Sequence, residues 1–348
     1  MTDRNKSAQR PGICRFFIRL FQIILYMPIQ VVFIPLAVVG VIVALYRENR
    51  ISRKRGVSYS AVQALQYRWI MHYFGTRPDP LSVSFVRKFP CESHFGMWGT
   101  LGALVVARRL FGFDTVLSRL PEPGKETLIS SVGRRLLMFD GIMEKYIDEV
   151  EQIVLPGIGF DLMALRFTKG KAVKVFELDQ ANTLNIKTET LKKAGIEHDW
   201  ITYVPVDYSR ESWVDKLIAA GFDKTGKTLF LWQSVSLYLE AGVVKETLQA
   251  MADLCVDGSV VAQDIYAQAF ASGETSRVVA RNRRLIGKMG EPWLFGVDMS
   301  GDAKAAVASF LKDCGLGMTA YTQFGDKLGI EPFYCIVEAE RLEKNNHN

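Results

Sequence analysis

Short apolar runs alternate with segments of helical periodicity from about residue 129 onward. The runs with strand character are QIVLPG, KAVKVFEL, WITYVPVD, TLFLWQSVSLYL and GSVVAQDIY. Segments of about 10 to 15 residues with helical character separate them, among them QANTLNIKTETLKKAG and SRESWVDKLIAAG. This order predicts a parallel sheet with helices on both faces, which is a doubly wound α/β fold.

The last two apolar runs depart from this alternation. GMTAYTQFG and PFYCIVEAERL follow each other without a helix-length segment between them. Strands joined so closely pair in antiparallel fashion. We therefore predict a mainly parallel, seven-stranded, Rossmann-like sheet that ends in an antiparallel C-terminal strand pair.

The N-terminal region carries the longest apolar run in the chain. No charged residue occurs between Arg19 and Arg47, a gap of 27 residues that is long enough to cross a bilayer as a helix. Pro28 and Pro35 would each remove a helix hydrogen bond, so a kinked span and a hairpin that dips into one leaflet both remain open. We predict a membrane segment at about residues 20–46.

The charges beside this segment do not select an orientation by themselves. Five basic residues precede it and five follow it: Arg4, Lys6, Arg10, Arg15 and Arg19, then Arg47, Arg50, Arg53, Lys54 and Arg55. Both flanks would lie on the cytoplasmic side of a hairpin, where they could attract anionic lipids. We expect the rest of the chain to face the cytoplasm.

The net charge of +6 belongs to this arm and not to the chain as a whole. Residues 1–60 hold 10 of the 43 Lys and Arg but 2 of the 37 acids, so the remainder carries 33 basic against 35 acidic residues. We therefore expect no nucleic-acid partner. The five cysteines are widely spaced and the histidines number four, which supports neither a disulfide framework nor a metal site.

Four regions follow from these patterns. They are a basic arm with the hydrophobic segment (1–56), a helical lid or substrate region (57–128), the α/β domain (129–340) and a polar tail (341–348). The oligomeric state is not predicted.

Ligands bind parallel open sheets at the carboxyl ends of the strands, so the turns after the strands are the candidate sites. Gly157 and Gly159 follow the first strand and would let the backbone approach a ligand closely, with Asp161 just beyond them. A dinucleotide fingerprint, G-x-G-x-x-G, would need a third glycine where Leu162 stands. The turn therefore lacks one element of a pyrophosphate site.

Carboxylates follow the second and third strands. Glu177 and Asp179 lie 18 and 20 residues beyond Gly159, the spacing at which an acid can bind ribose hydroxyls. Asp207 after the third strand could accept from an adenine amino group, with Tyr208 against the ring. The alternative for Asp207 is a capping role at the start of the next helix.

Four ordered motifs resemble the leucine carboxyl methyltransferase-like group of S-adenosylmethionine-dependent methyltransferases. VLPGIGFDLMALRF is similar to the first, VFELDQANTLNIKTETL to the second, and VPVDYSRESWVDKLIAAGFDKTGKTLFLWQSVSLYL to the third and fourth. The likeness covers roughly residues 57–340. Class I methyltransferases end in an antiparallel strand pair, whereas nicotinamide-binding domains usually continue in parallel, so the C-terminal pattern agrees with the resemblance.

The resemblance implies S-adenosyl-L-methionine as cofactor. It assigns Gly157 and Gly159 to the methionine portion, Asp179 to the ribose, and Asp207 with Tyr208 to the adenine. It also implies an arginine in the helix before the first strand for the cofactor carboxylate, and either Arg134 or Arg135 fits that place.

Three residues depart from the family pattern. Gln233 stands where the family commonly has glutamate, Ser234 replaces the glycine that follows, and Ala181 replaces a proline. Glutamine can still hydrogen-bond a cofactor amino group but offers no charge. Weaker cofactor binding, or loss of activity, is the corresponding alternative.

The implied activity is methyl transfer to a carboxyl or hydroxyl oxygen of a small or lipophilic acceptor, beside a membrane. In-line placement can supply much of the rate, so no catalytic residue is predicted. A hydroxyl acceptor would need a base, for which His72 and His94 are available. The alternatives are a catalytically inactive binding protein with this fold and, third, a nicotinamide-dependent oxidoreductase.

Overall fold

The computed structural model describes residues 12–208, 210–325 and 332–343. By internal packing the chain forms two compact units. One contains the chain up to Arg55 together with Arg68–Leu120, and the other contains Gly56–Tyr67 and the chain from Pro121 onward. The predicted region boundaries at residues 56, 128 and 340 stay predictions.

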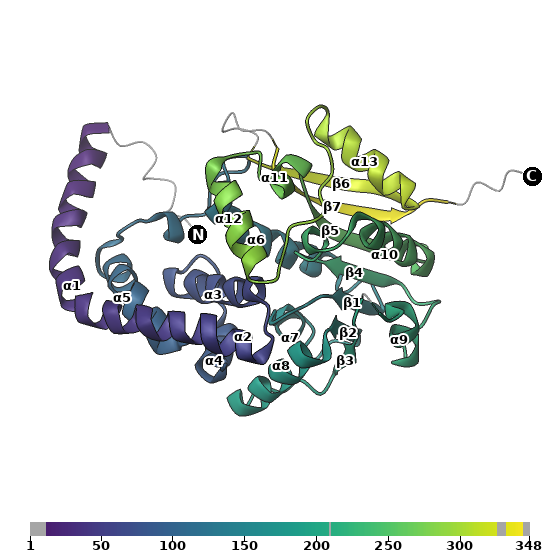
Figure 1. Ribbon diagram of the computed structural model, residues 1–348, viewed down its shortest axis with the longest axis horizontal. Coiled ribbons are helices and arrows are strands. Elements are labelled where there is room, and N and C mark those ends of the chain that lie inside the picture. Colours follow the sequence, from purple (N-terminus) through teal and green to yellow (C-terminus); the bar gives the residue numbers. More distant parts are fainter. Residues whose placement is uncertain (1–11, 209, 326–331, 344–348) are drawn as a thin grey trace, which may run out of the picture. The chain divides into compact units, whose positions relative to one another are not determined.

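The first unit is helical. Its elements are α1 (Gly12–Tyr46), the π-helix η2 (Arg47–Ile51), α2 (Ser52–Arg55), the later turns of α3 (Tyr59–Phe74), α4 (Pro80–Lys88), α5 (His94–Phe111) and the short 3-10 helix η3 (Val116–Ser118). α1 is one continuous helix that bends along its length (Figure 1), and Pro28 and Pro35 lie inside it. The choice between a kinked span and a hairpin in one leaflet stays a prediction.

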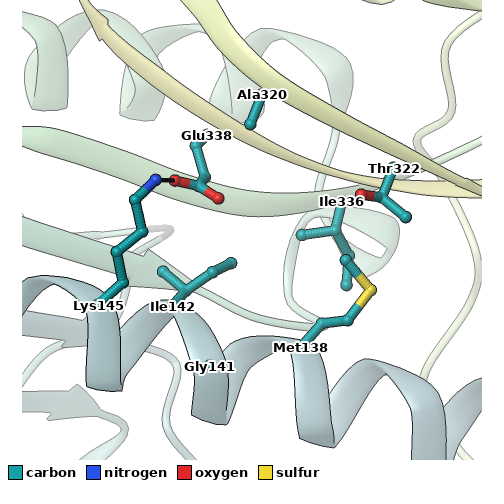
Figure 2. Close-up of a pocket in the computed structure, with 8 residues that line it drawn as sticks. All are labelled: Met138, Gly141, Ile142, Lys145, Ala320, Thr322, Ile336 and Glu338. Atoms are coloured by element: carbon teal, nitrogen blue, oxygen red, sulfur yellow. Dashed lines mark hydrogen bonds and ion pairs between the residues drawn. The ribbon is translucent and has the colours of Figure 1, made fainter.

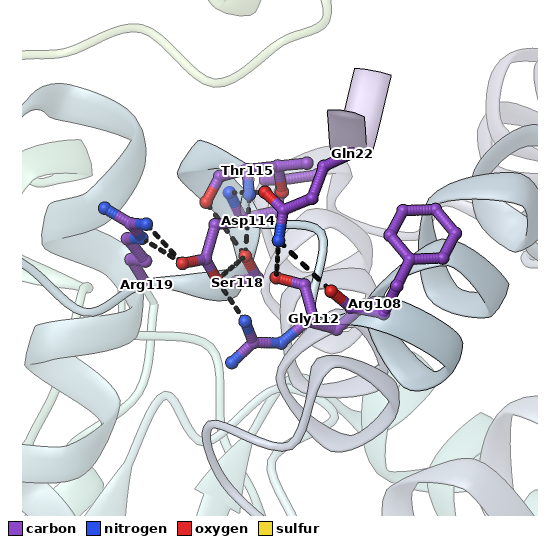
Figure 3. A network of polar contacts seen from close by, with 9 residues as sticks. Gln22, Arg108, Gly112, Asp114, Thr115, Ser118 and Arg119 are labelled. Carbon is purple, nitrogen blue, oxygen red and sulfur yellow. Dashed lines mark hydrogen bonds and ion pairs between the residues drawn. The ribbon is translucent and has the colours of Figure 1, made fainter. Parts of the chain in front are cut away.

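Glycines let α1 and α5 pack closely in antiparallel orientation. A Cβ on Gly99 would lie 2.4 Å from the backbone oxygen of Leu36, and a Cβ on Gly40 would lie 2.7 Å from that of Gly96. At the other end, Gln22 of α1 donates to the backbone oxygens of Phe111 (3.1 Å) and Gly112 (3.2 Å), next to an ion cluster around Asp114 (Figure 3).

The ion cluster orders the chain after α5. Arg108 and Arg119 both bind the Asp114 carboxylate, with Arg119 Nε at 2.7 Å from Oδ2. The Ser118 hydroxyl accepts from the Thr115 backbone N–H at 2.7 Å and completes a capping box (Figure 3). α1 is held to α5 near both ends of the contact, by Gln22 beside this cluster and by the close approach of Gly40 to Gly96 at the other end.

The second unit is the predicted α/β domain. Its strands are β1 (Gln152–Pro156), β2 (Lys174–Asp179), β3 (Ile201–Pro205), β4 (Thr228–Trp232), β5 (Val260–Tyr266), β6 (Leu316–Phe324) and β7 (Tyr334–Arg341). Its helices from Pro121 onward are α6 (Leu128–Tyr146), α7 (Met163–Phe167), α8 (Ala181–Ala194), α9 (Trp213–Ala219), the 3-10 helix η4 (Ser236–Tyr238), α10 (Ala241–Leu254), α11 (Gln268–Ser272), α12 (Arg277–Lys288) and α13 (Ala303–Asp313).

The strand order is β3-β2-β1-β4-β5-β7-β6. The first five strands are parallel, and β7 pairs antiparallel with both β5 and β6. Figure 1 shows α9, α10 and α13 on one side of the sheet and α6, α7 and α8 on the other. The predicted fold, including the antiparallel C-terminal pair, is confirmed.

One local expectation needs correction. The helix predicted to start at Ser209, which lies outside the described residues, begins instead at Trp213, because the Ser212 hydroxyl accepts from Asp215 N at 3.2 Å and caps α9 there.

A fully buried ion pair joins α8 to the sheet. Lys187 Nζ lies 2.6 Å from Glu177 Oε2 of β2, and it also donates to the backbone oxygen of Asp161 at 2.6 Å. Burial raises the pKa of Glu177, and the charge and hydrogen bond of Lys187 oppose this rise. One lysine thus connects α8, β2 and the turn after β1.

We predict that Lys187→Met destabilises the protein by about 3 to 5 kcal/mol, because Glu177 would be left as an uncompensated buried charge. The double variant Lys187→Met/Glu177→Gln should recover most of that loss. Urea unfolding measures both. Lys193→Met, which removes an exposed pair with Glu189, is the control and should change little. Equal losses in the single and double variants would contradict the prediction.

Candidate functional site: the carboxyl edge of the sheet

The turn after β1 contains two glycines. Gly157 (φ 66°) and Gly159 (φ 57°) both have left-handed backbone conformations. A Cβ on Gly157 would lie 2.4 Å from Cγ2 of Val235, in the turn after β4. A side chain at Gly157 would therefore be strained by its conformation and would collide with the neighbouring turn.

Asp179 at the end of β2 is tied to this turn. Gly159 N donates to Asp179 Oδ2 at 2.8 Å, and Gln180 N donates to Oδ1 at 2.8 Å. Burial raises the pKa of the Asp179 carboxyl, while these backbone donors lower it. The structure thus brings together the glycine turn and the acid that the spacing predicted.

Glu177 does not lie at this edge. It is fully buried against Lys187, so it is not available for the ribose contact that its spacing allowed. Side chains two residues apart on a strand share one face, so Glu177 and Asp179 are on the same face of β2. They differ in depth, because Asp179 is the last residue of the strand and Glu177 lies two residues inside it.

Asp161 forms hydrogen bonds within its own loop and with Lys187. Its Oδ1 accepts from Met163 N at 2.8 Å, at the start of α7, and its backbone oxygen accepts from Lys187. The side chain is buried. It therefore shapes the turn around Gly159, and a direct cofactor contact stays a prediction.

Asp207 and Tyr208 follow β3. Asp207 does not cap α9, since Ser212 does, but its backbone oxygen accepts from Arg210 N and Glu211 N in a local turn. The Tyr208 hydroxyl is buried and has no hydrogen-bond partner in the described part of the chain. Burial and then the charge of Asp179 raise the pKa of Tyr208 well above its usual value, and the backbone of Gly157 opposes this. Tyr208 therefore lies close to both the glycine turn and Asp179.

The turn after β4 contains a strained residue that sequence reasoning noted only as a departure. Ser234 has φ 61° and, among the described residues, is the one non-glycine residue with a positive φ. Its backbone N donates to Asp264 Oδ1 at 2.7 Å and its hydroxyl to Oδ2 at 3.2 Å. The two hydrogen bonds to Asp264 hold this serine in its left-handed conformation.

Asp264 of β5 is a residue that the sequence analysis missed. It is fully buried and also accepts from the Tyr334 hydroxyl at 3.1 Å. Burial raises its pKa, and the charge of Arg135 opposes this rise. An acid within the apolar run VVAQDIY was the available signal, because such a residue needs a partner when buried.

The two candidate arginines of α6 differ in their surroundings. Arg135 is buried, donates to the Tyr266 hydroxyl at 3.1 Å and lies 3.9 Å from Asp264 Oδ2. Its Nε has no hydrogen-bond partner in the described part. Arg134 is more exposed and lies 4.0 Å from Glu126. Arg135 is therefore the one that shares a polar cluster with the turn after β4.

Gln233 is half-buried next to that turn, and no hydrogen bond of its side chain occurs within the described residues. The first turn of α3 covers the same edge, since Ala61 Cβ lies 3.3 Å from the place of a Cβ on Gly159. Glu291 holds this end of α3, with Oε1 at 2.5 Å from Tyr59 N and Oε2 at 3.1 Å from Ser60 N.

The two histidines considered as bases have structural partners. His72 Nδ1 accepts from the backbone of Asp79 at 2.9 Å, and His94 Nδ1 accepts from Trp69 Nε1 at 3.0 Å. Burial lowers the pKa of both.

A cavity of about 210 Å³ lies elsewhere, between α6 and the strands β6 and β7 (Figure 2). Lys145 Nζ and the Tyr146 hydroxyl both bind Glu338 Oε2 there, each at 2.7 Å. Its lining includes none of the residues predicted to bind the cofactor.

The strand order, the terminal antiparallel pair and the glycine turn tied to an acid after β2 define a domain of the class I methyltransferase fold. Residues 103–252 match the family model described as leucine carboxyl methyltransferase. The match confirms the resemblance that the four motifs carried.

Curated relatives agree with this assignment. The chain is 30% identical over 175 residues to a protein of Mycobacterium sp. (strain KMS), covering 47% of this chain and 53% of that protein. It is 28% identical over 217 residues to a protein of Mycobacterium marinum, covering 61% and 65%. Both are named "Putative S-adenosyl-L-methionine-dependent methyltransferase". The match spans about half the length of the first of these relatives.

Solved structures give remote likenesses. The mitomycin 7-O-methyltransferase MmcR has a TM-score of 0.41 and 13% identity, covering 61% of this chain and 55% of that one. Geranyl diphosphate C-methyltransferase from Streptomyces coelicolor A3(2) has a TM-score of 0.43 and 10% identity, covering 62% and 83%. Neither identifies an activity.

We predict that Ser234→Ala destabilises the protein more than Ser234→Gly, by about 1 kcal/mol. Both variants lose the hydroxyl bond to Asp264, but glycine also relieves the left-handed conformation. Thermal unfolding checks the order of stability. The control is Ser272 in α11, where the usual helix preference should make Ala more stable than Gly. The same order at both sites would contradict the prediction.

Proposed function

We propose that this protein is an S-adenosylmethionine-dependent methyltransferase, attached to a membrane, that methylates an oxygen of a small or lipophilic acceptor. The observation that carries the proposal is the turn at Gly157 and Gly159, whose backbone is bonded to Asp179 at the carboxyl edge of a class I sheet. The names of the curated relatives support the same cofactor.

The residues at this edge suit that cofactor. The left-handed turn at Gly157 and Gly159 lies next to Asp179, and the buried Tyr208 hydroxyl has an unused hydrogen-bonding capacity that a bound nucleoside could satisfy. Asp179 would accept from ribose hydroxyls, and Asp207 with Tyr208 would contact the adenine.

The opposite end of the cofactor would meet the turn after β4. Arg135, through its unpaired Nε, is better placed than Arg134 to attract a carboxylate. Gln233 would accept from the cofactor's amino group through its amide oxygen without adding a charge.

The cofactor, when bound, supplies an electrophilic methyl group. The chain's part is then to orient the acceptor oxygen and to exclude water. Because His72 and His94 each use Nδ1 in a structural bond, a carboxylate acceptor, which needs no base, is favoured over a hydroxyl.

A second candidate is a protein that binds the cofactor without turnover, and Gln233 in place of the family glutamate is the observation in its favour. A nicotinamide oxidoreductase is disfavoured, since Leu162 replaces the third glycine and β7 is antiparallel. Binding of the cofactor without methyl transfer to any component of a cell extract would favour the second candidate.

We predict that Asp179→Asn weakens binding of S-adenosylmethionine about tenfold, because a charged acceptor for the ribose hydroxyls is lost. Calorimetry with S-adenosylmethionine and S-adenosylhomocysteine measures the change. Asp223→Asn, which alters an exposed carboxylate bonded to Thr225, is the control and should bind as the wild type does. No binding by the wild-type protein would refute the proposed function.

The membrane attachment is supported by α1. Its stretch Phe16–Tyr46 is long and apolar enough to cross a bilayer. An 18-residue window within it has a mean hydropathy of 2.5, and 6% of that window is buried. Large apolar side chains are exposed along most of its length. We propose that the second unit faces the cytoplasm.

We predict that the wild-type chain stays with membranes after carbonate extraction, whereas Val32→Lys/Val39→Lys is released. Each lysine in the middle of a membrane segment costs about 2.5 to 3.5 kcal/mol. Val32 and Val39 are both exposed and lie on one side of α1. The control Val116→Lys/Leu342→Lys changes two exposed apolar residues elsewhere and should remain bound. Release of the wild type would rule out the anchor.

A further inference from the structure

We propose that α12 is a docking surface for an anionic lipid bilayer. The helix reads RVVARNRRLIGK and carries five basic residues and no acid. Only Val279 is buried; the five basic residues are exposed. The inference deepens the proposed membrane attachment but concerns a surface separate from α1.

The basic residues form a stripe. Arg277, Arg281, Arg284 and Lys288 are separated by four, three and four residues, which places them on one face of the helix. Arg283 adds a fifth charge outside the stripe. Among the described residues none of the five has an ion-pair partner.

Such a stripe opposes the folding of the helix. Like charges three and four residues apart repel each other, and Arg277 meets the positive end of the helix dipole. The Ser276 hydroxyl, which accepts from Val279 N at 3.2 Å, and the burial of Val279 hold the helix against this repulsion. An external anionic surface would remove the repulsion.

Two exposed apolar side chains decide which anionic partner fits. Val278 (60% exposed) and Leu285 (47% exposed) are seven residues, or about two turns, apart, so both lie on the same face, along the edge of the basic stripe. A helix at a bilayer surface places cations among headgroups and apolar side chains at the acyl boundary. A nucleic-acid backbone would bind the cations but would leave Val278 and Leu285 without a role.

The basic charge of α12 contrasts with the nearly balanced charge of the rest of the chain beyond residue 60. Beyond residue 60 the sequence carries 33 basic and 35 acidic residues, so five cations without an acid within twelve residues are a local excess. Attraction to anionic lipid is additive over such residues and falls off within a Debye length.

The test uses the full chain with a polarity-sensitive fluorophore on Val278→Cys. Cys14 is exposed and the other four cysteines are buried, so Cys14→Ser removes the competing thiol. The labelled protein is reconstituted in phosphatidylcholine vesicles with or without about 30% phosphatidylserine. We expect a blue shift only with phosphatidylserine, and its loss in about 1 M salt.

Charge reversal provides the matched comparison. Arg281→Glu/Arg284→Glu/Lys288→Glu should weaken the lipid response about a hundredfold. Lys174→Glu/Lys192→Glu/Lys224→Glu changes the net charge equally at exposed sites of other elements and should respond as the wild type does.

Three results would overturn the proposal: no shift with anionic vesicles, an equal shift with neutral vesicles, or a shift with an RNA oligonucleotide and none with vesicles. A failure of α1 to anchor the chain is distinguishable, because binding through α12 alone would persist on anionic vesicles at low salt and be reversed by salt.

Discussion

The buried contact of Lys187 with Glu177 and with the backbone of Asp161 is the interaction on which the candidate site depends. It fixes α8 against β2 and, through Asp161, fixes the turn after β1. Without it, Glu177 would be an unpaired charge inside the sheet. The two ends of the hydrogen bond between Gly159 and Asp179 are thus held by elements that one lysine joins.

A comparable arrangement supports the other half of the edge. Asp264 holds Ser234 in a left-handed conformation, and Val235 in the same turn lies against Gly157. Asp264 also lies near Arg135, so the turn after β4 and α6 share one buried carboxylate. A substitution at Asp264 would therefore act on Ser234, Tyr334 and Arg135 together.

The surfaces outside the α/β core have a different chemistry. α1 exposes apolar side chains along its length, and α12 exposes a stripe of unpaired cations beside two apolar residues. Each is unfavourable in water, for hydrophobic and electrostatic reasons respectively. The proposed contact with a bilayer that has anionic headgroups would relieve both.

The sequence by itself determined the strands of the sheet, its antiparallel ending, the apolar helix and the residues of the turns after β1, β2 and β3. Strand patterns, helix patterns and glycine positions are local properties of the chain, so they can be recognised without the fold. It could not separate Glu177 from Asp179 or Arg134 from Arg135, nor indicate Asp264, because those distinctions depend on which side chains meet inside the fold. Burial against Lys187 excluded Glu177 from the candidate site, and contact with Tyr266 and Asp264 distinguished Arg135 from Arg134. The pairing of β4 with β5 placed Asp264 beside Ser234. Those contacts join residues far apart in the chain, and only the tertiary structure brings them within hydrogen-bond distance.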